Sequence, residues 1–411
     1  MTALSHDFAA RASILDANDP LGDFPGRFVG SDDPAIVAYL DGNSLGRPTR
    51  ETAGRMAAFV TEAWGGRLIR GWDEGWFDLP LTLGDRIGAS LLGAAAGQTA
   101  IGDSTSVLLY KLARGALALR PGRTEIVLDR DNFPTDRYLM ESIAEESGMT
   151  LRWIDADFSG GVTVQELTEA VSERTALVVL SHVAYRSGFL LDAPAIVDAT
   201  HDAGALLLLD VCHSVGAVEI ELDSWGVDFA AGCTYKYLNG GPGAPAFGYV
   251  NAAHLPRFQQ PIWGWMGRED PFEMAQGYVP APGIRRLISA SPGIAGMIPI
   301  QDTLDLIEEA GMPAIRAKSL ALTGFALDLV QQWLAPRGVT ISSPLNPARR
   351  GGHVTIDHPR FREITTRLWQ RGVIPDFRLP HGIRIGMSPL STTFREALAG
   401  VTAIRDELDA N

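Results

Sequence analysis

Between about residues 100 and 250, short and nearly continuous apolar segments alternate with longer segments of helical periodicity. Apolar runs of this length are typical of strands buried on both faces. They span residues 124–129, 150–155, 175–183, 205–210 and 229–237. Between them, 164–174 and 193–204 have helical spacing and end in glycine or polar residues. This alternation predicts an α/β fold with a mainly parallel sheet sandwiched by helices.

The last third of the chain has a different pattern. Helices are expected over 302–311, 313–334, 359–372 and 392–410, and strands over 352–358, 373–378 and 382–387. Two or three strands with helices on one face predict a smaller α+β unit. We therefore expect three parts: an N-terminal arm (1–45) that packs on the smaller unit, a large domain (46–300) and a small C-terminal domain (301–411).

Charge and composition exclude several classes of function. The chain has 35 Lys and Arg against 49 Asp and Glu, a formal charge of -14, and no cluster of cations. Nucleic acids and anionic membranes bind clustered cations, so neither is an expected partner. No apolar segment reaches the roughly 20 residues of a membrane helix, and the N-terminus lacks the apolar core of a signal peptide. Cys212 and Cys233 lack zinc-ligand spacing, so no metal is expected and a cytoplasmic location fits best.

The chain has three lysines, Lys111, Lys236 and Lys318. Lys236 stands between two tyrosines, after an apolar segment and before a glycine-rich turn. Burying a lysine is unfavourable without an ion-pair partner or a covalent role. Asp210 ends the preceding predicted strand, at the sheet edge where α/β folds bind ligands. A simple salt bridge between the two is the alternative, and Asp210 could also merely cap the segment that follows.

Two further segments are expected at the same sheet edge. Residues 102–106 (GDSTS) precede a helical pattern whose free N–H groups would favour an anion, although they could act only as an N-cap. Phe133 and Asp136 follow the strand at 124–129, although this segment could be a plain surface loop. A helix start that binds an anion, an aromatic ring, a carboxylate and a lysine are together what pyridoxal phosphate requires.

The chain resembles the kynureninase family, whose members are homodimeric pyridoxal-phosphate enzymes of fold type I in the class V aminotransferase group. The resemblance runs from about residue 39 to 400. It is carried by the motifs YLDGNSLG, LIRGWDEGW, DSTSVLLYKL, NFPTDRY, WGWMG and GIRIGMSPL and by the block from Leu208 to Gly243. That block, which joins Asp210 to Lys236, is the most specific part.

The resemblance implies a role for each matching residue. Lys236 would carry the cofactor and move the Cα proton, while Asp210, helped by Asp136, would pair with the pyridine nitrogen and Phe133 would stack on the ring. The phosphate would meet Ser104, Thr105 and Tyr235, the last also near the proton-transfer steps. The other implied positions are Ser181, His213 and Ser291 at the cofactor, Trp265 reaching the phosphate of a neighbouring subunit, Arg384 gripping the substrate carboxylate, and Asn43 and Trp72 on the substrate side.

The implied reaction is hydrolysis of the Cβ–Cγ bond of L-kynurenine or 3-hydroxykynurenine, a step of tryptophan catabolism that yields L-alanine and an anthranilate. The chain departs from the family pattern on the substrate side, at Ser391 (usually tyrosine), at Ala290 and Ser291, and at Arg268. A class V aminotransferase or lyase acting on another β-substituted amino acid is therefore the alternative. A desulfurase is disfavoured because it needs a mobile cysteine. A non-catalytic scaffold is disfavoured by the retention of Asp210, Tyr235 and Lys236 together.

Overall fold

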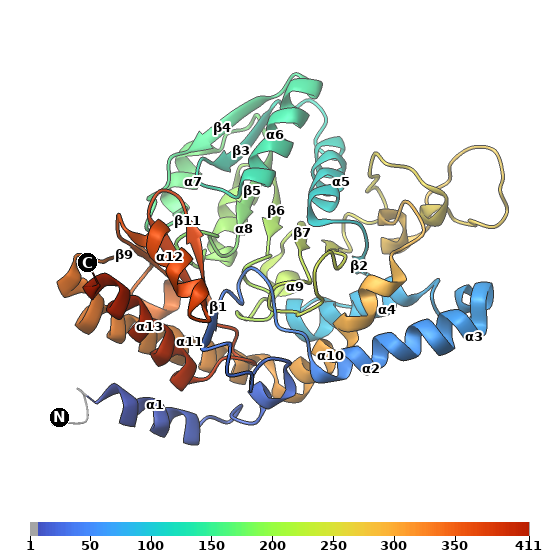
Figure 1. The fold of residues 1–411 in the computed structure, drawn as a ribbon. Helices are drawn as coiled ribbons and strands as arrows, with labels where there is room; N and C mark the ends of the chain where they lie inside the picture. Colours follow the sequence, from blue (N-terminus) through green and yellow to red (C-terminus); the bar gives the residue numbers. More distant parts are fainter. Residues whose placement is uncertain (1–6, 411) are drawn as a thin grey trace.

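The computed structural model describes residues 7–410 and contains two sheets. The larger has seven strands in the order β2-β8-β7-β6-β5-β3-β4 (Figure 1). Strands β4, β3, β5, β6 and β7 are parallel, whereas β8 runs antiparallel to both β7 and β2. The strands are β2 (Thr99–Ile101), β3 (Glu125–Asp129), β4 (Thr150–Ile154), β5 (Thr175–Ser181), β6 (Leu206–Asp210), β7 (Phe229–Gly232) and β8 (Phe247–Val250).

Helices cover both faces of this sheet, as expected from the buried, apolar strands. Helices α5 (Thr105–Ala118) and α6 (Pro134–Ser147) pack on one face, in a core with alternate strand residues such as Leu206 and Leu208. The other face packs Leu207 and Leu209 against a second core. That core includes residues of α4 (Leu79–Ile87), α7 (Val164–Ala170), α8 (Ala193–Asp202), α9 (Leu222–Trp225) and α10 (Ile294–Ala310). The α/β architecture predicted from the pattern is confirmed.

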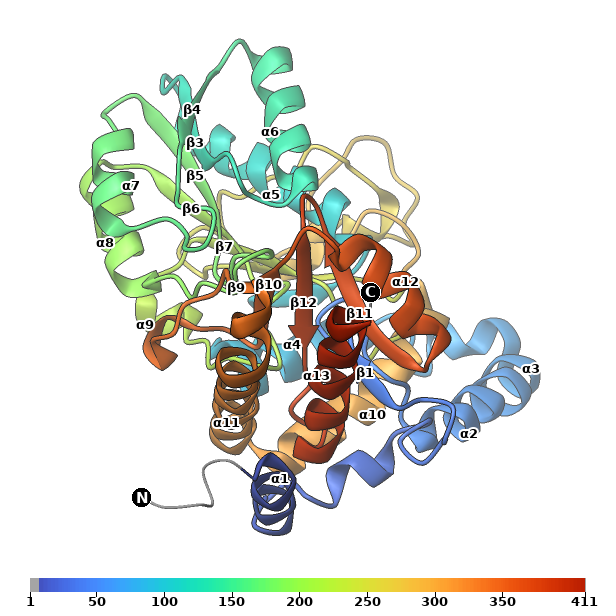
Figure 2. The ribbon, with the colours of Figure 1, turned by 60° about the vertical axis from the view of Figure 1, so that its left-hand side comes forward.

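The smaller sheet has five strands in the order β1-β11-β12-β10-β9 (Figure 2). They are β1 (Ala38–Leu40), β9 (Thr340–Ile341), β10 (His353–Asp357), β11 (Val373–Arg378) and β12 (Gly382–Gly386). One face packs on α1 (Phe8–Ala17), α11 (Met312–Leu329), α12 (Phe361–Gln370) and α13 (Phe394–Asp409). Because side chains alternate along a strand, Ile383 and Ile385 enter this core while Arg384 points to the opposite face.

The N-terminal arm packs on the smaller unit, as expected. Strand β1 pairs in parallel with β11, and Phe8 in α1 contacts Trp333, with ring centroids 5.0 Å apart. This strand is missing from the two or three predicted for the small unit because its partner lies more than 330 residues away along the chain. Helix α10 runs across residue 300, so the division into 1–45, 46–300 and 301–411 stays a prediction, and residues 1–6 lie outside the described part.

Lys236 does not lie in a strand. The apolar segment 229–237 was expected to be extended throughout, but β7 ends at Gly232 and the chain turns. Backbone hydrogen bonds hold this turn in place. Within it, Gly240 N donates to Thr234 O, and Gly46 N, just after the N-terminal arm, donates to Tyr235 O. The apolar character of the segment reflects burial of the loop itself. Similarly, the strand expected to end at residue 183 ends at Ser181.

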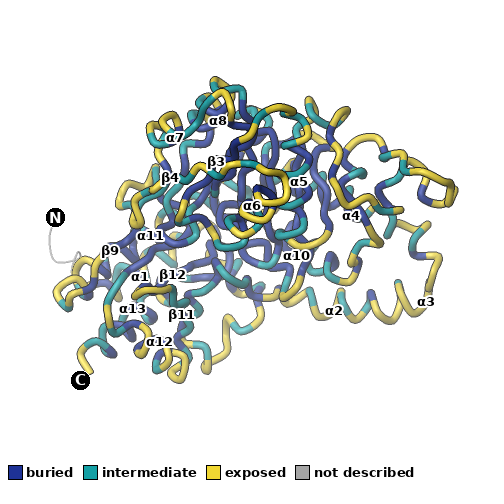
Figure 3. Tube along the Cα trace, turned by 90° about the horizontal axis from the view of Figure 1, so that it is seen from above, coloured by how far each residue is buried: buried dark blue, intermediate teal, exposed yellow. Residues whose placement is uncertain are grey.

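Two segments project from the body on one side in Figure 1. The first, the helical arm, contains α2 (Arg50–Ala58), the π-helical turn Phe59–Trp64, α3 (Gly65–Arg67) and the 3-10 turn Leu68–Trp72. The second, the aromatic loop, spans residues 258–282. Figure 3 shows the helical arm as largely exposed, in contrast to the buried strands. Among residues 7–410, no helix is both long enough and apolar enough to cross a membrane.

Candidate active site at the C-terminal edge of the large sheet

Several polar residues lie where neighbouring parallel strands end. The strand register pairs Ser181 with Asp210, and Asp210 with Ala231 two residues before the turn that carries Lys236. Asp129 ends β3 on the other side of β5. The carboxyl ends of parallel strands meet at one edge of a sheet, which is where open α/β folds bind ligands. The predicted convergence of Asp210 and Lys236 at this edge is therefore found.

The three lysines differ in their partners. Lys111 Nζ lies 2.5 Å from Asp103, and Lys318 Nζ lies 2.7 Å from Asp19, so both are buried and paired with carboxylates. Lys236 is also buried, but its Nζ lies 2.9 Å from His213 Nε2, and it forms no ion pair with a carboxylate among residues 7–410. A histidine nitrogen leaves the lysine amine free of a permanent charge partner, as a reactive amine requires.

Asp210 and Asp136 form an acidic pair that lies close enough to Lys236 to be influenced by its charge. Asp210 Oδ1 accepts from Cys212 N at 2.7 Å, which orients the carboxylate. Asp136, in the first turn of α6, is buried, and neither of its carboxylate oxygens has a hydrogen-bond partner within residues 7–410. Burial, followed by the neighbouring Asp210 carboxylate, raises the pKa of Asp136 well above its ordinary value, while Lys236 acts in the opposite direction. A positively charged N–H donor placed here would supply the Asp136 carboxylate with a partner and favour its ionised form.

The start of α5 is suited to an anion. Ser104 is the N-cap residue, and its side chain accepts from Val107 N at 3.4 Å. This serine therefore caps the helix, which was the alternative role for residues 102–106. The hydroxyl oxygen of Thr105, the first residue of the helix, is buried and has no partner among the described residues. The helix has 14 residues, and its free N–H groups carry partial positive charge at this end. An anion here would satisfy the Thr105 hydroxyl.

A cleft of about 280 Å³ adjoins the start of α5. Its lining joins Gly102 and Asp103 to the segment 288–293, which includes Ser291. Lys111 holds this junction together because it pairs with Asp103 and also donates to Leu287 O at 2.9 Å. Ser291 thus lies near the anion end of the site, as its predicted role requires.

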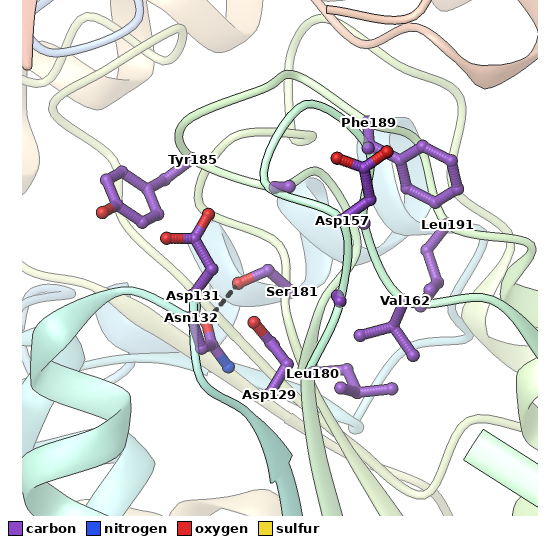
Figure 4. Close-up of a pocket in the computed structure, with 14 residues that line it drawn as sticks. Asp129, Asp131, Asn132, Asp157, Val162, Leu180, Ser181, Tyr185, Phe189 and Leu191 are labelled. Carbon is purple, nitrogen blue, oxygen red and sulfur yellow. Dashed lines mark hydrogen bonds between the residues drawn. The ribbon is translucent and has the colours of Figure 1, made fainter. Parts of the chain in front are cut away.

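Phe133 and Ser181 border the site on a second side, and Figure 4 labels Ser181 and its partner Asn132. The Lys236 ammonium lies 6.0 Å from the centre of the Phe133 ring, which packs edge-on against Tyr185 with centroids 5.4 Å apart. Ser181 Oγ donates to Asn132 Oδ1 at 2.8 Å, and Asn132 Oδ1 also accepts from Phe133 N. Asn132 therefore fixes the position of the aromatic ring. It was not predicted, although it immediately precedes Phe133.

Tyr235 and His213 flank the lysine. The Lys236 ammonium lies 6.0 Å from the centre of the Tyr235 ring. Burial, followed by the nearby Cys233 thiol, raises the pKa of Tyr235 above its ordinary value, so its phenol stays protonated. Burial, followed by the Lys236 charge, lowers the pKa of His213 well below its ordinary value. A neutral histidine and a protonated phenol both leave the lysine as the basic group of the site.

Arg384 approaches this edge from the smaller sheet. It is buried, and its guanidinium contacts Asp376 Oδ2, Tyr185 O and Ser44 Oγ at 2.6, 2.7 and 2.8 Å. Tyr185 also contacts Phe133, so the arginine and the aromatic ring border one region. Sequence reasoning missed Asp376, Tyr185 and Ser44, although Ser44 directly follows the predicted Asn43.

Asn43 lies in the segment 41–47, which joins the two sheets. Gly42 N donates to Gly386 O, at the end of the strand that carries Arg384, and Gly46 N donates to Tyr235 O. A Cβ on Gly46 would stand 2.3 Å from Lys236 O, so glycine is required for this close approach. Asn43 is fully buried, and neither end of its amide has a partner among the described residues. Its amide is thus available to a ligand.

Trp72 and Trp265 lie on the two projecting segments rather than beside Lys236. Trp72 packs on Trp76, with ring centroids 5.8 Å apart, and against the apolar cluster that contains Ile294 and Ile298. Trp265, in the 3-10 helix Trp265–Gly267, is 41% exposed and packs edge-on against Phe272. The predicted substrate role of Trp72 and cofactor role of Trp265 stay predictions, and an exposed Trp265 remains available to a second copy.

Comparison with known proteins agrees with this arrangement. The family described as Kynureninase C-terminal domain matches residues 315–404, which include Arg384. The chain is 39% identical over 402 residues to a kynureninase of Pseudomonas fluorescens, covering 96% of this chain and 94% of that protein. It is 40% identical over 405 residues to a kynureninase of Burkholderia pseudomallei (strain 1106a), covering 97% and 95%.

Similar solved structures support the fold alone. A cysteine desulfurase from Thermococcus onnurineus NA1 has a TM-score of 0.82 at 17% identity, covering 95% of this chain and 98% of that chain. A C-DES mutant with glycine covalently linked to its PLP cofactor has a TM-score of 0.80 at 16% identity, covering 94% and 98%. Identity of 39–40% along nearly the whole chain decides the family: this chain belongs to the kynureninases.

Proposed function

We propose that the chain is a pyridoxal-phosphate-dependent hydrolase that cleaves the Cβ–Cγ bond of L-kynurenine or 3-hydroxykynurenine. The products are L-alanine and anthranilate or 3-hydroxyanthranilate, which makes the protein an enzyme of tryptophan catabolism. One observation carries the proposal: Lys236 is a buried lysine that faces a neutral histidine instead of a carboxylate, near the buried Asp136, whose carboxylate has no hydrogen-bond donor among the described residues.

The residues at the sheet edge fit the cofactor at both of its ends. The Asp136 oxygens lack a donor, which a protonated pyridine nitrogen would provide, and the Thr105 hydroxyl lacks a partner, which a phosphate would provide. Asp210 and Asp136 would hold the ring nitrogen, Phe133 the ring face, and Ser104, Thr105 and Ser291 the phosphate. When bound, the cofactor supplies an electron sink for the electron pairs released at the substrate carbon atoms.

The chain's own residues would then handle the protons. Lys236 removes the proton from Cα, since its amine is free of a carboxylate partner. His213 accepts a hydrogen bond from that amine and keeps it oriented. Tyr235 donates from a phenol whose raised pKa keeps it protonated throughout turnover. Asp210 keeps its charge oriented through its bond from Cys212 N.

Arg384 would bind the α-carboxylate of the substrate, a task suited to its planar fork. Its contacts with Asp376, Tyr185 and Ser44 hold the guanidinium in one orientation before the substrate binds. The buried Asn43 amide has free hydrogen-bonding capacity on the same side. Arg384 lies in the smaller sheet and Lys236 in the turn after β7 of the larger sheet, so substrate binding joins the two parts of the fold.

We also propose that the protein is a cytoplasmic homodimer with its active site at the subunit interface. Support comes from the apolar surface of the two projecting segments. Ten of the 19 large apolar residues exposed within residues 7–410 lie there. They are Val60, Trp64, Leu68 and Ile69 on the helical arm and Ile262, Trp263, Trp265, Phe272, Met274 and Val279 on the aromatic loop. Concentrated exposed apolar residues mark association surfaces.

The test is to incubate the purified protein and pyridoxal phosphate with kynurenine, 3-hydroxykynurenine and a panel of other β-substituted amino acids, and to identify the products. We expect steady formation of an anthranilate and alanine in equal amounts without a keto-acid acceptor. A requirement for such an acceptor would favour an aminotransferase and refute the hydrolase. A desulfurase is disfavoured because Cys212 and Cys233 are both buried, and sulfide release from cysteine at a higher kcat/KM than kynurenine cleavage would contradict that reasoning.

A further inference from the structure

The turn after β5, residues 184–189, is bonded to the smaller unit at several successive points. The carbonyl oxygens of residues 185–188 all accept hydrogen bonds from that unit. In chain order their donors are Arg384, Thr355, Ser343 and Gly351. Gly188 has a φ of +73°, and a Cβ on it would stand 2.8 Å from the backbone of β10, so this close approach requires glycine. The turn therefore joins the two parts of the fold at fixed positions.

The Arg186 side chain, in the middle of this turn, contacts the same part of the smaller sheet. Like Arg384, it is 1% exposed. Its Nη2 donates to the two oxygens of Asp357 at 2.9 and 3.2 Å, and its Nη1 donates to Leu379 O at 2.9 Å. The Phe158 ring packs on the guanidinium, with its centre 3.6 Å from Cζ. Asp357 ends β10 and Leu379 follows β11, so Arg186 is bonded on both sides of β12, the strand that carries Arg384.

The peptide group between Tyr185 and Arg186 is held from both of its ends. Thr355 and Arg384 are direct cross-strand partners in β10 and β12. The Thr355 hydroxyl donates to Arg186 O, and Arg384 Nη1 donates to Tyr185 O at 2.7 Å. The Tyr185 carbonyl carbon is bonded to the Arg186 nitrogen in one planar group. Anchoring the Arg186 side chain therefore restricts where Tyr185 O can lie, and with it one of the contacts that orient Arg384.

Stability alone does not explain a buried arginine at this point. The desolvation of a buried ion pair offsets much of its attraction, and apolar side chains of similar volume often stabilise a fold as well or better. What such a pair provides instead is a defined geometry. Arg350 is a useful contrast, because it is 3% exposed and its side chain donates to Thr323 Oγ1, Pro344 O and Leu345 O, which all belong to the smaller unit.

We propose that Arg186 is a positioning residue that acts through Arg384 on substrate binding. It fixes the peptide group after Tyr185, so that Tyr185 O holds the Arg384 guanidinium in place before a carboxylate arrives. The same turn carries the Tyr185 ring that packs on Phe133, so the arginine and the aromatic ring are positioned by one residue. The inference rests on the proposed role of Arg384 as the group that binds the substrate α-carboxylate, and it is independent of which bond the enzyme cleaves.

The first test measures binding apart from turnover. L-Alanine, which carries an α-carboxylate, is titrated into the cofactor-loaded protein and followed by visible absorbance. In Arg186→Met, which keeps an unbranched chain but has no donor, Arg384 must be ordered when the ligand binds. We expect the Kd for alanine and the KM for kynurenine to rise together by roughly 3- to 10-fold, the cost of ordering one long side chain. The value of kcat should change by less than about twofold, because the reacting groups are untouched.

Arg350→Met is the matched control, because it also removes a buried arginine but leaves the turn at 184–189 bonded as before. It should keep the wild-type Kd for alanine even if it lowers stability. A folded Arg186→Met protein with the wild-type Kd, or an equal rise in Arg350→Met, would overturn the proposal. So would a loss in Arg186→Met that falls on kcat and leaves KM unchanged.

A double variant tests whether the effect passes through Arg384. Once Arg384→Ala is present, Arg186→Met should lower kcat/KM by less than about twofold more, because the group that it positions is gone. Independent losses that multiply would contradict the proposal. A protein in which Arg186→Met weakens alanine binding as expected but which does not cleave kynurenine would refute the proposed function and support the positioning role.

Thr355→Val decides the question if Arg186→Met does not fold. Valine has nearly the shape of threonine but lacks the hydroxyl that donates to Arg186 O. The Kd for alanine should rise by about twofold or more, in line with the loss of one hydrogen bond. Thr365→Val is its control, because the Thr365 hydroxyl donates to Phe361 O within α12. An unchanged Kd in Thr355→Val, or an equal rise in Thr365→Val, would overturn the proposal.

Discussion

The guanidinium of Arg384 and the carboxylate of Asp376 form a buried ion pair, with Nε and Nη2 2.6 and 2.5 Å from the same carboxylate oxygen. Tyr185 O and Ser44 Oγ accept from the other side of the group. The arginine is thus held in one rotamer by three different segments of the chain. Little side-chain entropy remains to be lost when a substrate carboxylate binds.

Arg384→Ala should therefore weaken substrate binding strongly. The lost charge-assisted contact corresponds to roughly 2 to 4 kcal/mol, so we expect KM for kynurenine to rise by roughly 30- to 1000-fold. Steady-state kinetics measure this. Arg378→Ala is the control, because Arg378 Nε also lies 3.0 Å from Asp376 but the side chain is 38% exposed. A KM for Arg384→Ala within a factor of about three of the wild type would exclude the assigned role.

Lys236→Ala should abolish turnover while the cofactor still binds noncovalently. Asp210, Asp136, Phe133 and the start of α5 remain in place, so most of the binding contacts persist. We expect the visible absorbance band of the lysine-linked cofactor to disappear and denaturing mass spectrometry after borohydride reduction to find no attached cofactor. Lys318→Arg, which keeps the ion pair with Asp19, should retain both signals. Undiminished activity of Lys236→Ala is the result that would end the assignment.

Asp129 should make the stability of the cofactor-free protein fall as pH rises. Burial, followed by the Asp131 carboxylate, raises the pKa of Asp129 from 3.8 to about 7. Between these values the folded state binds more protons than the unfolded state, so the protonated form stabilises the fold below about pH 4 and its contribution is lost toward pH 7. The slope is about 1.4 kcal/mol per pH unit for one group.

Denaturant unfolding at several pH values between 4 and 7 measures this effect in the wild type and in Asp129→Asn. The difference between their free energies of unfolding should shift steadily in favour of the asparagine variant as pH rises, because asparagine cannot ionise. Asp129 and Asp157 line one pocket at the C-terminal edge of the large sheet (Figure 4). Asp157→Asn is the control, since Asp157 is exposed. A difference that is independent of pH would show that Asp129 is ionised throughout.

Ile69→Asp should weaken self-association. Ile69 on the helical arm is 76% exposed, and a carboxylate buried at an interface is strongly unfavourable. We expect light scattering to report a dimer for the wild type and a larger monomer fraction for the variant. Leu379→Asp is the control because Leu379 is 70% exposed but lies outside both projecting segments. A monomeric wild type, or equal dissociation in both variants, would contradict the proposed interface.

The order of strands and helices could be predicted from the chain alone. Buried parallel strands such as β5 and β6 are apolar at every position between their ends, and helices such as α8 have their own periodicity, so local sequence reports the element. The common sheet edge of Asp210 and Lys236 also followed, because parallel topology brings successive strand ends together. The same reasoning misjudged 229–237, because the apolar pattern of a buried turn is indistinguishable from that of a strand.

Only the tertiary structure decided which distant segments meet, within the smaller sheet and between the two sheets. The pairing of β1 with β11 and the contacts of Ser44 with Arg384 and of His353 with His213 leave no local pattern, since each joins residues that lie far apart along the chain. The tertiary structure also distinguishes the three lysines. All three are buried, and they differ in the side chain that each amine contacts. Composition and periodicity record how much of a segment is buried, whereas the chemistry of a site depends on neighbours that only folding brings together.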